Sequence, residues 1–483
     1  MTQTNRILYI PFYYENHFDL TLNRLITNEN SAEYRVFTVD KRFVTNDLNL
    51  ILSVCRRILS DKQTDIQLII SDSQIGQMIV AKLAEEYQRI RNRGMKFLNI
   101  FKCMNRYLLT EVFGRDECIP TLMVDMTNDA EENKKAIEIF FADMKFDIFV
   151  KSTYAFDEQS SSFRFQNWQT FDDMFDTYVK LYQEQYYDSL LPLFRIYIPK
   201  NRYLSIMKPN YLIQPFFDLI TYPHWRLVIA NACIYNHEII MWPLVDGYCG
   251  WPFLTDRPLA ILPILVCPSR QLSNEQENSV YNHFRKHLNH LINNYNLRFG
   301  WIECSYFVSC TNEIRLFSLK PTCSAYLTNR FDAIAQYGNP IHALIDLSNH
   351  QRPRTPILNG KTVYIYRLWM KTKQKYFFND LIDTKLVKRI KSQSNHCIRL
   401  RFHENDILNE YERLICIEIG FIQVSGDYHE IGLANLVELR LNLLKKPEIF
   451  PFVHHSLLST HGDQFDPITC LPSNELLNQF EKA

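Results

Sequence analysis

Short apolar runs alternate with helical patterns over the first hundred residues of this 483-residue chain. Residues 7–10 and 66–70 are apolar runs of the length expected for buried strands. After the second run come a polar turn and then apolar positions with the spacing of one helix face, at Ile75, Met78, Ile79, Leu83 and Tyr87. Strand–turn–helix units of this kind build parallel sheets, so residues 6 to 95 are predicted to form an α/β unit.

The next part of the chain combines helical and strand patterns. Helices are predicted from Met104 to about Phe113 and from Glu131 to Met144, the second before a strand that ends at Lys151. An aromatic-rich helical stretch over residues 171–187 is interpreted as an insertion whose rings pack in a core.

Two paired strands are predicted over residues 225–229 and 238–241, with a turn at residues 235–237. Ser273 and Gln276 form a Ser-x-x-Gln capping box that predicts the start of a helix. The apolar side of that helix would carry Val280, Phe284, Leu288, Leu291 and Ile292. Further strands over 362–366 and 415–424, with a helix over 434–444, predict a small α+β region at the end.

Composition narrows the class of protein. Lys plus Arg and Asp plus Glu are both 53, so overall charge favours neither nucleic acid nor an anionic membrane as partner. The 12 cysteines include no C-x-x-C pair, which is typical of reduced, buried thiols. The first residues lack the basic and apolar regions of a signal peptide, and residues 258–268 are too short to span a membrane. We therefore expect a cytoplasmic protein.

Four stretches occur in a fixed order along the middle of the chain. They are FKCMNRYLL at 101–109, DIFVK at 147–151, LIQPFF at 212–217, and GWIE at 300–303 leading into LKP at 319–321. Their order and surroundings resemble the ATP-grasp superfamily, whose carboxylate–amine ligases clamp ATP between two small α+β subdomains. The resemblance covers about residues 60 to 345, and no motif matches in full.

The resemblance implies a mixed α/β and α+β fold in four parts. Residues 1–95 would form a Rossmann-like domain of the kind that precedes the ATP-grasp clamp. Residues 96–205 and 206–348 would form the two lobes of the clamp, and residues 349–483 a small C-terminal α+β domain.

The same resemblance implies roles for residues of the clamp. Arg106 and Lys151 would contact phosphate, although a solvated helix arginine and a lysine at a strand end are the ordinary alternatives. The adenine and ribose contacts would come from Gln214, Pro215, Phe216 and Asp218, with an ordinary strand edge as the alternative. The segment after Lys151 contains hydroxyl groups but no glycine, so a tight phosphate-covering loop is not expected.

The metal site departs most from the family pattern. Glu303 matches the first magnesium carboxylate, but Ser318 and Lys320 stand where a second carboxylate and an asparagine are expected. A hairpin turn centred on Thr311 and Asn312 would place Glu303 opposite Lys320. Magnesium prefers several hard oxygen ligands, so two alternatives stay open. Lys320 either takes the place of the metal against phosphate or pairs with Glu303 in an inactive site.

The resemblance implies a function in outline. Arg226 and Lys320 would belong to the catalytic centre, with ATP bound and magnesium in doubt. An active protein would join a small carboxylate to an amine through an acyl phosphate. The alternative is a catalytically degenerate ATP-grasp protein that serves as a nucleotide-binding or protein-interaction module.

Overall fold

The computed structural model describes the strands and helices that frame the molecule. It describes residues 5–10, 34–38, 48–61, 63–71, 74–91, 94–125, 128–142, 148–152, 162–165, 168–174, 210–215, 225–248, 264–270, 272–323, 325–370, 375–390, 396–400, 404–408, 417–427 and 429–450. No helix among them is both long enough and apolar enough to cross a membrane.

The N-terminal unit contains a parallel sheet of three strands in the order β2-β1-β3. The parallel pairing and the strands β1 and β3 are predicted from the sequence, whereas β2 is not. Its elements are β1 (Asn5–Tyr9), β2 (Tyr34–Thr38), α2 (Leu48–Ser60), β3 (Leu68–Ile70) and α3 (Gln74–Glu86). One face of the sheet packs on α2 and α3, where Leu8 and Ile69 join the largest hydrophobic core. The other face packs on Ile341 and Ile345 of α12 (Pro340–Ser348).

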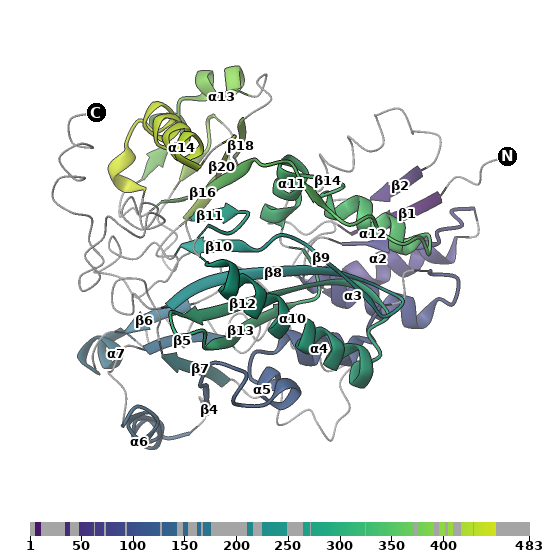
Figure 1. Cartoon of the computed structure of the whole chain (residues 1–483), viewed down its shortest axis with the longest axis horizontal. Coiled ribbons are helices and arrows are strands. Elements are labelled where there is room, and N and C mark those ends of the chain that lie inside the picture. Colours follow the sequence, from purple (N-terminus) through teal and green to yellow (C-terminus); the bar gives the residue numbers. More distant parts are fainter. Residues whose placement is uncertain are drawn as a thin grey trace.

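A second sheet of four antiparallel strands, in the order β4-β7-β5-β6, forms a separate lobe at the lower left of Figure 1. The lobe comprises β4 (Leu122–Asp125), α6 (Ala130–Phe140), β5 (Ile148–Ser152), β6 (Ser162–Phe165), α7 (Trp168–Met174) and β7 (Asn210–Pro215), and the helices α4 (Phe97–Met104) and α5 (Leu108–Phe113) precede it along the chain. The helix expected over 131–144 ends at Phe140. Of the expected insertion helix, α7 covers the first residues, and residues 175–187 lie outside the described part.

The predicted helix from Met104 to Phe113 is wrong in one respect, because the chain forms two helices there. Asn105, 4% exposed, breaks the run between α4 and α5. Its side-chain oxygen accepts hydrogen bonds from the backbone N–H groups of Tyr107 (3.0 Å) and Leu108 (3.1 Å). Asparagine competes well for such donors, so a new helix begins where the sequence pattern looks continuous.

The largest sheet has nine strands and runs through the middle of Figure 1. Its path is β13-β12-β8-β10-β11-β16-β20-β18, and β9 pairs with β8. The strands are β8 (Trp225–Tyr235), β9 (Glu238–Met241), β10 (Val245–Tyr248), β11 (Ile264–Cys267), β12 (Phe299–Ser309), β13 (Ile314–Lys320), β16 (Thr362–Met370), β18 (His396–Leu400) and β20 (Ile417–Gly426). Strands from the last third of the chain thus extend the sheet of the second lobe.

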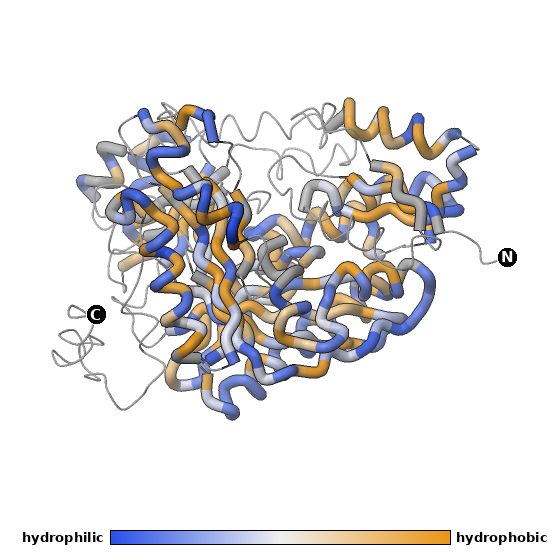
Figure 2. Tube along the Cα trace, turned by 90° about the horizontal axis from the view of Figure 1, so that it is seen from above, coloured by the Kyte–Doolittle hydropathy of each residue, from blue (hydrophilic) through white to orange (hydrophobic). Residues whose placement is uncertain are grey.

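Helices cover both faces of this sheet. On the face that carries Ile302 and Cys304, α4 and α10 (Asn274–Tyr295) pack on β8, β12 and β13. On the opposite face, α11 (Ala325–Ile334) and α12 pack around Trp301. The remaining elements are β14 (Ala335–Gln336), β15 (Ile357–Leu358), β17 (Tyr376–Phe377), η4 (Phe378–Asp380), α13 (Thr384–Ile390), β19 (Ile407–Leu408), α14 (His429–Leu443) and η5 (Pro447–Ile449). Figure 2 shows hydrophobic residues concentrated in the strands and interspersed with hydrophilic ones along the helices.

Helix α10 starts where the sequence predicts. The Ser273 side chain accepts from the Gln276 backbone N–H, and the Gln276 side chain accepts from the Ser273 backbone N–H. The capping box satisfies two N–H groups that the helix itself cannot pair. All the predicted apolar positions of this helix are buried.

A polar cluster ties α10 to the loop that leads into the first lobe. Nδ1 of His287 lies 2.9 Å from the Tyr306 hydroxyl of β12, and its Nε2 lies 3.3 Å from a carboxylate oxygen of Glu117. Lys286 Nζ lies 2.5 Å from the other Glu117 oxygen. Burial raises the pKa of the Glu117 carboxyl, but Lys286 and His287 lower it more, so the net pKa lies below its ordinary value. The cluster fixes the base of the lobe against the central sheet.

Candidate functional site

A buried ion pair lies at the end of the hairpin formed by β12 and β13. Glu303 pairs with Lys320 across the two strands, and Nζ of Lys320 lies 3.5 Å from the Glu303 carboxylate. The side chains are 2% and 14% exposed. The opposition of Glu303 to Lys320 and of Ser305 to Ser318 is the pairing predicted from the sequence.

The loop centre and the strand register of the hairpin both differ from the predicted ones. The strands pair as Val308 with Ile314, which centres the loop on Thr311 rather than between Thr311 and Asn312. Phe317 is an extra residue on β13, because the register shifts between Ser305 and Tyr306. The loop offset and the bulge cancel, so the predicted pairing holds at the site.

Asn231 is a polar residue of this site that the sequence analysis missed. It lies opposite Glu303 on β8, and its side chain is fully buried. Its Oδ1 accepts a hydrogen bond of 2.9 Å from the Trp301 indole, while its Nδ2 has no hydrogen-bond partner within the described residues. A buried amide donor without a hydrogen-bond partner is costly to stability, and Asn231 Nδ2 is such a donor. A single asparagine in the apolar run LVIANACIY was the available signal.

Two predicted nucleotide contacts lie on neighbouring strands of the first lobe. Lys151 of β5 pairs with Leu212 of β7, and Phe149 pairs with Gln214. Gln214 is buried and donates from Nε2 to the Thr121 hydroxyl at 2.7 Å. Pro215 ends β7. The backbone thus brings the segments of Lys151 and Gln214 together on neighbouring strands. Phe216 and Asp218 lie outside the described residues.

Arg106 lies in the short connection between α4 and α5 and is half-buried. The predicted phosphate-contacting cation is therefore on a turn fixed by the Asn105 cap, not on the surface of a continuous helix. Helix α4 packs on β13, the strand that carries Lys320. This places the Arg106 segment at the junction of the first lobe and the large sheet.

The structure does not bring Arg226 together with Glu303. Successive residues of a strand point to opposite faces of the sheet. Arg226 pairs with Val308 and alternates with Leu227, whereas Glu303 pairs with Asn231. Val308 packs in the core beneath α10, and Trp301 packs on the opposite face, which Glu303 shares. The predicted convergence of Arg226 on the Glu303 position is therefore not seen.

Solved structures match the chain over most of its length, although no protein-family model and no curated protein matches its sequence. An L-amino acid ligase from Bacillus licheniformis has a TM-score of 0.64 and 12% identity, covering 92% of this chain and 98% of that chain. An ADP-complexed N5-carboxyaminoimidazole synthetase from Staphylococcus aureus has a TM-score of 0.57 and 13% identity, covering 92% of this chain and 97% of that chain. A biotin carboxylase from Campylobacter jejuni, solved as a β-γ-ATP complex, has a TM-score of 0.58 and 11% identity, covering 99% of each chain.

These are structures of ATP-grasp ligases. The chain has the ATP-grasp fold. The fold class predicted from the four sequence segments is thus confirmed. At such low identity the likeness establishes the fold alone.

The described residues of this ATP-grasp fold do not fit the magnesium site that the family pattern implies. Magnesium needs several oxygen ligands, commonly carboxylates. At the position in question, Glu303 is held by Lys320, and the next pair along the hairpin is Ser305 with Ser318. No group of three or more His, Cys, Asp or Glu side chains among the described residues could hold a metal ion. An ammonium group next to the one carboxylate disfavours a divalent cation by charge repulsion.

Proposed function

We propose that this chain is a protein of the ATP-grasp ligase type that binds an adenine nucleotide between its two lobes. The observation that carries the proposal is the position of the Glu303–Lys320 pair, which stands at the end of the β12–β13 hairpin in an ATP-grasp fold. Solved structures of the same fold include complexes with ADP. The Lys151 and Gln214 segments, side by side on β5 and β7, supply the facing lobe.

The local charge supports metal-independent binding of the nucleotide. Lys320 is 14% exposed at its side chain, so its ammonium group can reach a ligand while it offsets the Glu303 charge. A phosphate oxygen would accept a hydrogen bond from Lys320 Nζ. Charge-assisted hydrogen bonds of this kind are stronger than neutral ones, particularly where water is excluded.

In the ligase form of the proposal, a substrate carboxylate oxygen attacks the terminal phosphorus of ATP, and ADP leaves. An amine then attacks the acyl carbon of the acyl phosphate, inorganic phosphate leaves, and the amine loses a proton. The task of the protein is to position the reactants and to offset the negative charge of the transferred phosphoryl group. Lys320 is the residue proposed to supply that charge from β13.

The second candidate is a nucleotide-binding or interaction module without ligase chemistry. The specific observation in its favour is the same ion pair, because a carboxylate already neutralised by lysine leaves little need for a further cation. In its nucleotide-binding form, this module would share the nucleotide site with the first candidate and would differ from it only in lacking turnover.

Thermal unfolding with ATP tests the proposal, since a ligand that binds only the folded state raises its unfolding temperature. We expect ATP to raise that temperature equally in magnesium and in EDTA. A rise that requires magnesium would contradict the role given to Lys320. No rise in either condition would contradict nucleotide binding. Release of phosphate or ADP in the presence of mixed carboxylates and amines then separates the ligase from the non-catalytic module.

The variant Ser318→Glu with Lys320→Asn restores the ligand types that the family pattern has at these positions. We expect its ATP-dependent rise in unfolding temperature to become dependent on magnesium, because two carboxylates and an amide would then line the hairpin end. Cys310→Glu, at an exposed position next to the loop of the same hairpin, is the matched control and should leave the magnesium response as in the natural chain. A folded double variant that still ignores magnesium would refute the proposed alignment of this hairpin.

A further inference from the structure

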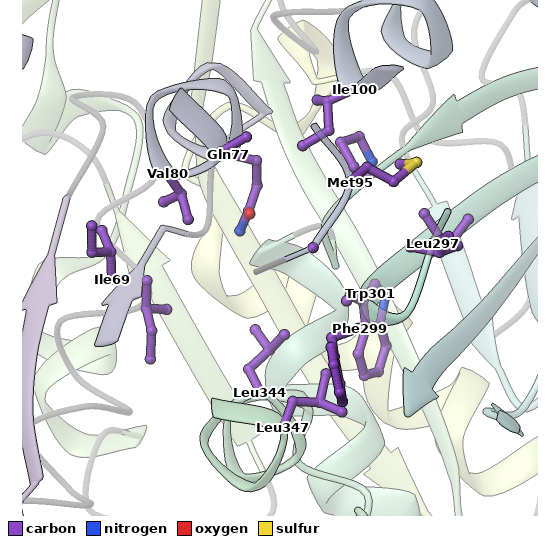
Figure 3. Close-up of a pocket in the computed structure, with 16 residues that line it drawn as sticks. Ile69, Gln77, Val80, Met95, Ile100, Leu297, Phe299, Trp301, Leu344 and Leu347 are labelled. Atoms are coloured by element: carbon purple, nitrogen blue, oxygen red, sulfur yellow. The ribbon is translucent and has the colours of Figure 1, made fainter. Parts of the chain in front are cut away.

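A small apolar cavity lies where the N-terminal unit meets the large sheet (Figure 3). Its volume is about 70 Å³. Ile69 of β3 and Val80 of α3 line one side, Trp301 of β12 lines another, and Leu344 and Leu347 of α12 close the third. Among the described lining residues the one polar side chain is Gln77, whose Nε2 donates to the Ser71 carbonyl, and the rest of the lining is apolar, so the cavity favours apolar groups.

The cavity exists because β12 continues beyond its partner strand. β13 ends at Lys320, opposite Glu303, so Phe299 to Ile302 pair only with β8. The side of β12 left by β13 faces the N-terminal unit, where Gly94 comes close to it. A Cβ atom on Gly94 would lie 2.9 Å from the Phe299 carbonyl oxygen, so this approach requires glycine.

A larger cleft of about 550 Å³ adjoins this cavity. The two hollows share four lining residues, Ala81, Gly94, Met95 and Phe299. Its volume falls in the range of sites for small molecules. The cleft and the cavity together form a wide opening with a narrow apolar end.

Positive charge gathers at the cleft. Its wall includes Arg91, Lys96 and Arg298, of which Lys96 and Arg298 are exposed. The carboxylate in the cleft wall, Glu85, accepts a hydrogen bond of 2.7 Å from the Phe97 backbone N–H at the start of α4. It also lies 3.8 Å from Lys82 Nζ. The negative charge is therefore engaged by the protein itself, and the three cations give the cleft a net attraction for anions.

We infer that this composite pocket binds a small amphipathic anion, a carboxylate or phosphate on a short apolar chain. The apolar chain enters the cavity beside Trp301, where removal of its CH₂ groups from water favours binding. The anionic group stays in the cleft near Arg298 and Lys96. This inference requires neither nucleotide binding nor ligase chemistry.

The orientation distinguishes this ligand from a reacting carboxylate. Ile302 and Pro321, the chain neighbours of Glu303 and Lys320, line the apolar end. The anionic group would therefore point away from the ion pair and could not attack a phosphate bound there. The pocket is a second ligand site that touches the two strands of the candidate nucleotide site.

Isothermal titration of the full chain with hexanoate and with hexyl phosphate tests the inference. At least one of them should bind, and the stronger of the two identifies the preferred anionic group. Acetate lacks the apolar chain and hexyltrimethylammonium has the opposite charge, so neither should bind. Absence of binding by both anions, or equal binding of hexyltrimethylammonium, would overturn the inference.

Two variants test whether the anion binds in this pocket. Arg298→Ala should weaken the binding at least about five-fold, whereas Arg285→Ala, an exposed arginine of α10, should not change it. Ala81→Leu fills the junction of cavity and cleft and should abolish binding in a chain that keeps its unfolding transition. If Ala81→Leu fails to fold, the Arg298 comparison decides. Natural affinity in Arg298→Ala would place the binding elsewhere and refute the site.

Discussion

At the scale of single residues, the Glu303–Lys320 pair combines burial with charge. Removing one partner of a buried pair leaves the other charge uncompensated, which typically costs about 3–5 kcal/mol. Lys320 retains some exposure, so we expect Lys320→Met to lower the free energy of unfolding by about 3 kcal/mol. Urea denaturation without nucleotide measures this loss.

Two further variants show whether the loss comes from the pair. Adding Glu303→Gln to Lys320→Met should recover most of the stability, because the uncompensated carboxylate is gone. Lys134→Met removes the exposed pair of Lys134 with Asp172 and should cost less than about 1 kcal/mol. A loss in Lys320→Met no larger than that of Lys134→Met would show that Glu303 does not depend on the lysine.

His287 makes stability depend on pH. Burial lowers its pKa to about 4, below the ordinary 6.5, although Glu117 acts in the opposite direction. The unfolded chain therefore takes up a proton at a higher pH than the folded chain does. The stability due to neutral His287 is complete above pH 6.5 and is lost as the pH falls towards 4. His287→Gln should flatten the dependence of the unfolding free energy on pH in this window, as measured by urea denaturation. An unchanged slope would contradict this account.

At the scale of elements, Gly338 permits a tight junction between β14 and α12. A Cβ atom there would lie 1.9 Å from the Phe331 carbonyl oxygen, and the Gly338 carbonyl accepts from the Trp242 indole at 2.9 Å. We expect Gly338→Ala to destabilise the fold by about 3 kcal/mol or more, because backbone must move. Gly360→Ala is the control, since Gly360 has a φ of +85° but open space around it. It should cost only about 1 kcal/mol. Thermal unfolding of the two variants makes the comparison.

Elements that begin at a recognisable capping motif could be predicted from the sequence. The start of α10 follows from Ser273 and Gln276. The opposition of Glu303 to Lys320 agrees with the prediction only because the loop offset and the bulge at Phe317 cancel, and no local pattern indicates either of them. The division between α4 and α5 could not be predicted, because apolar positions continue on both sides of Asn105, whose side chain competes for the backbone N–H groups. The position of Asn231 opposite Glu303 depends on the register of β8 against β12, which no local pattern specifies.

At the scale of the whole molecule, the N-terminal unit does not have a core of its own. Leu8 and the buried side of α2 share one cluster with β12 and α10. The opposite face of the same small sheet, which carries Ile7 and Tyr9, is covered by α12. Both faces therefore depend on the lobe that carries Glu303 and Lys320, and the walls of the candidate second site belong to one packed body.

We therefore expect the N-terminal unit and the large sheet to unfold in one transition. Cys55 of α2 and Cys304 of β12 are both fully buried and report on the two regions. Thiol labelling at increasing urea, with the labelled residues located by mass spectrometry, should give the same midpoint for both. Leu8→Ala should lower the two midpoints together, because the leucine belongs to the shared core. Labelling of Cys55 at a lower urea concentration than Cys304 would show that the N-terminal unit opens by itself, and the second ligand site would then open with it.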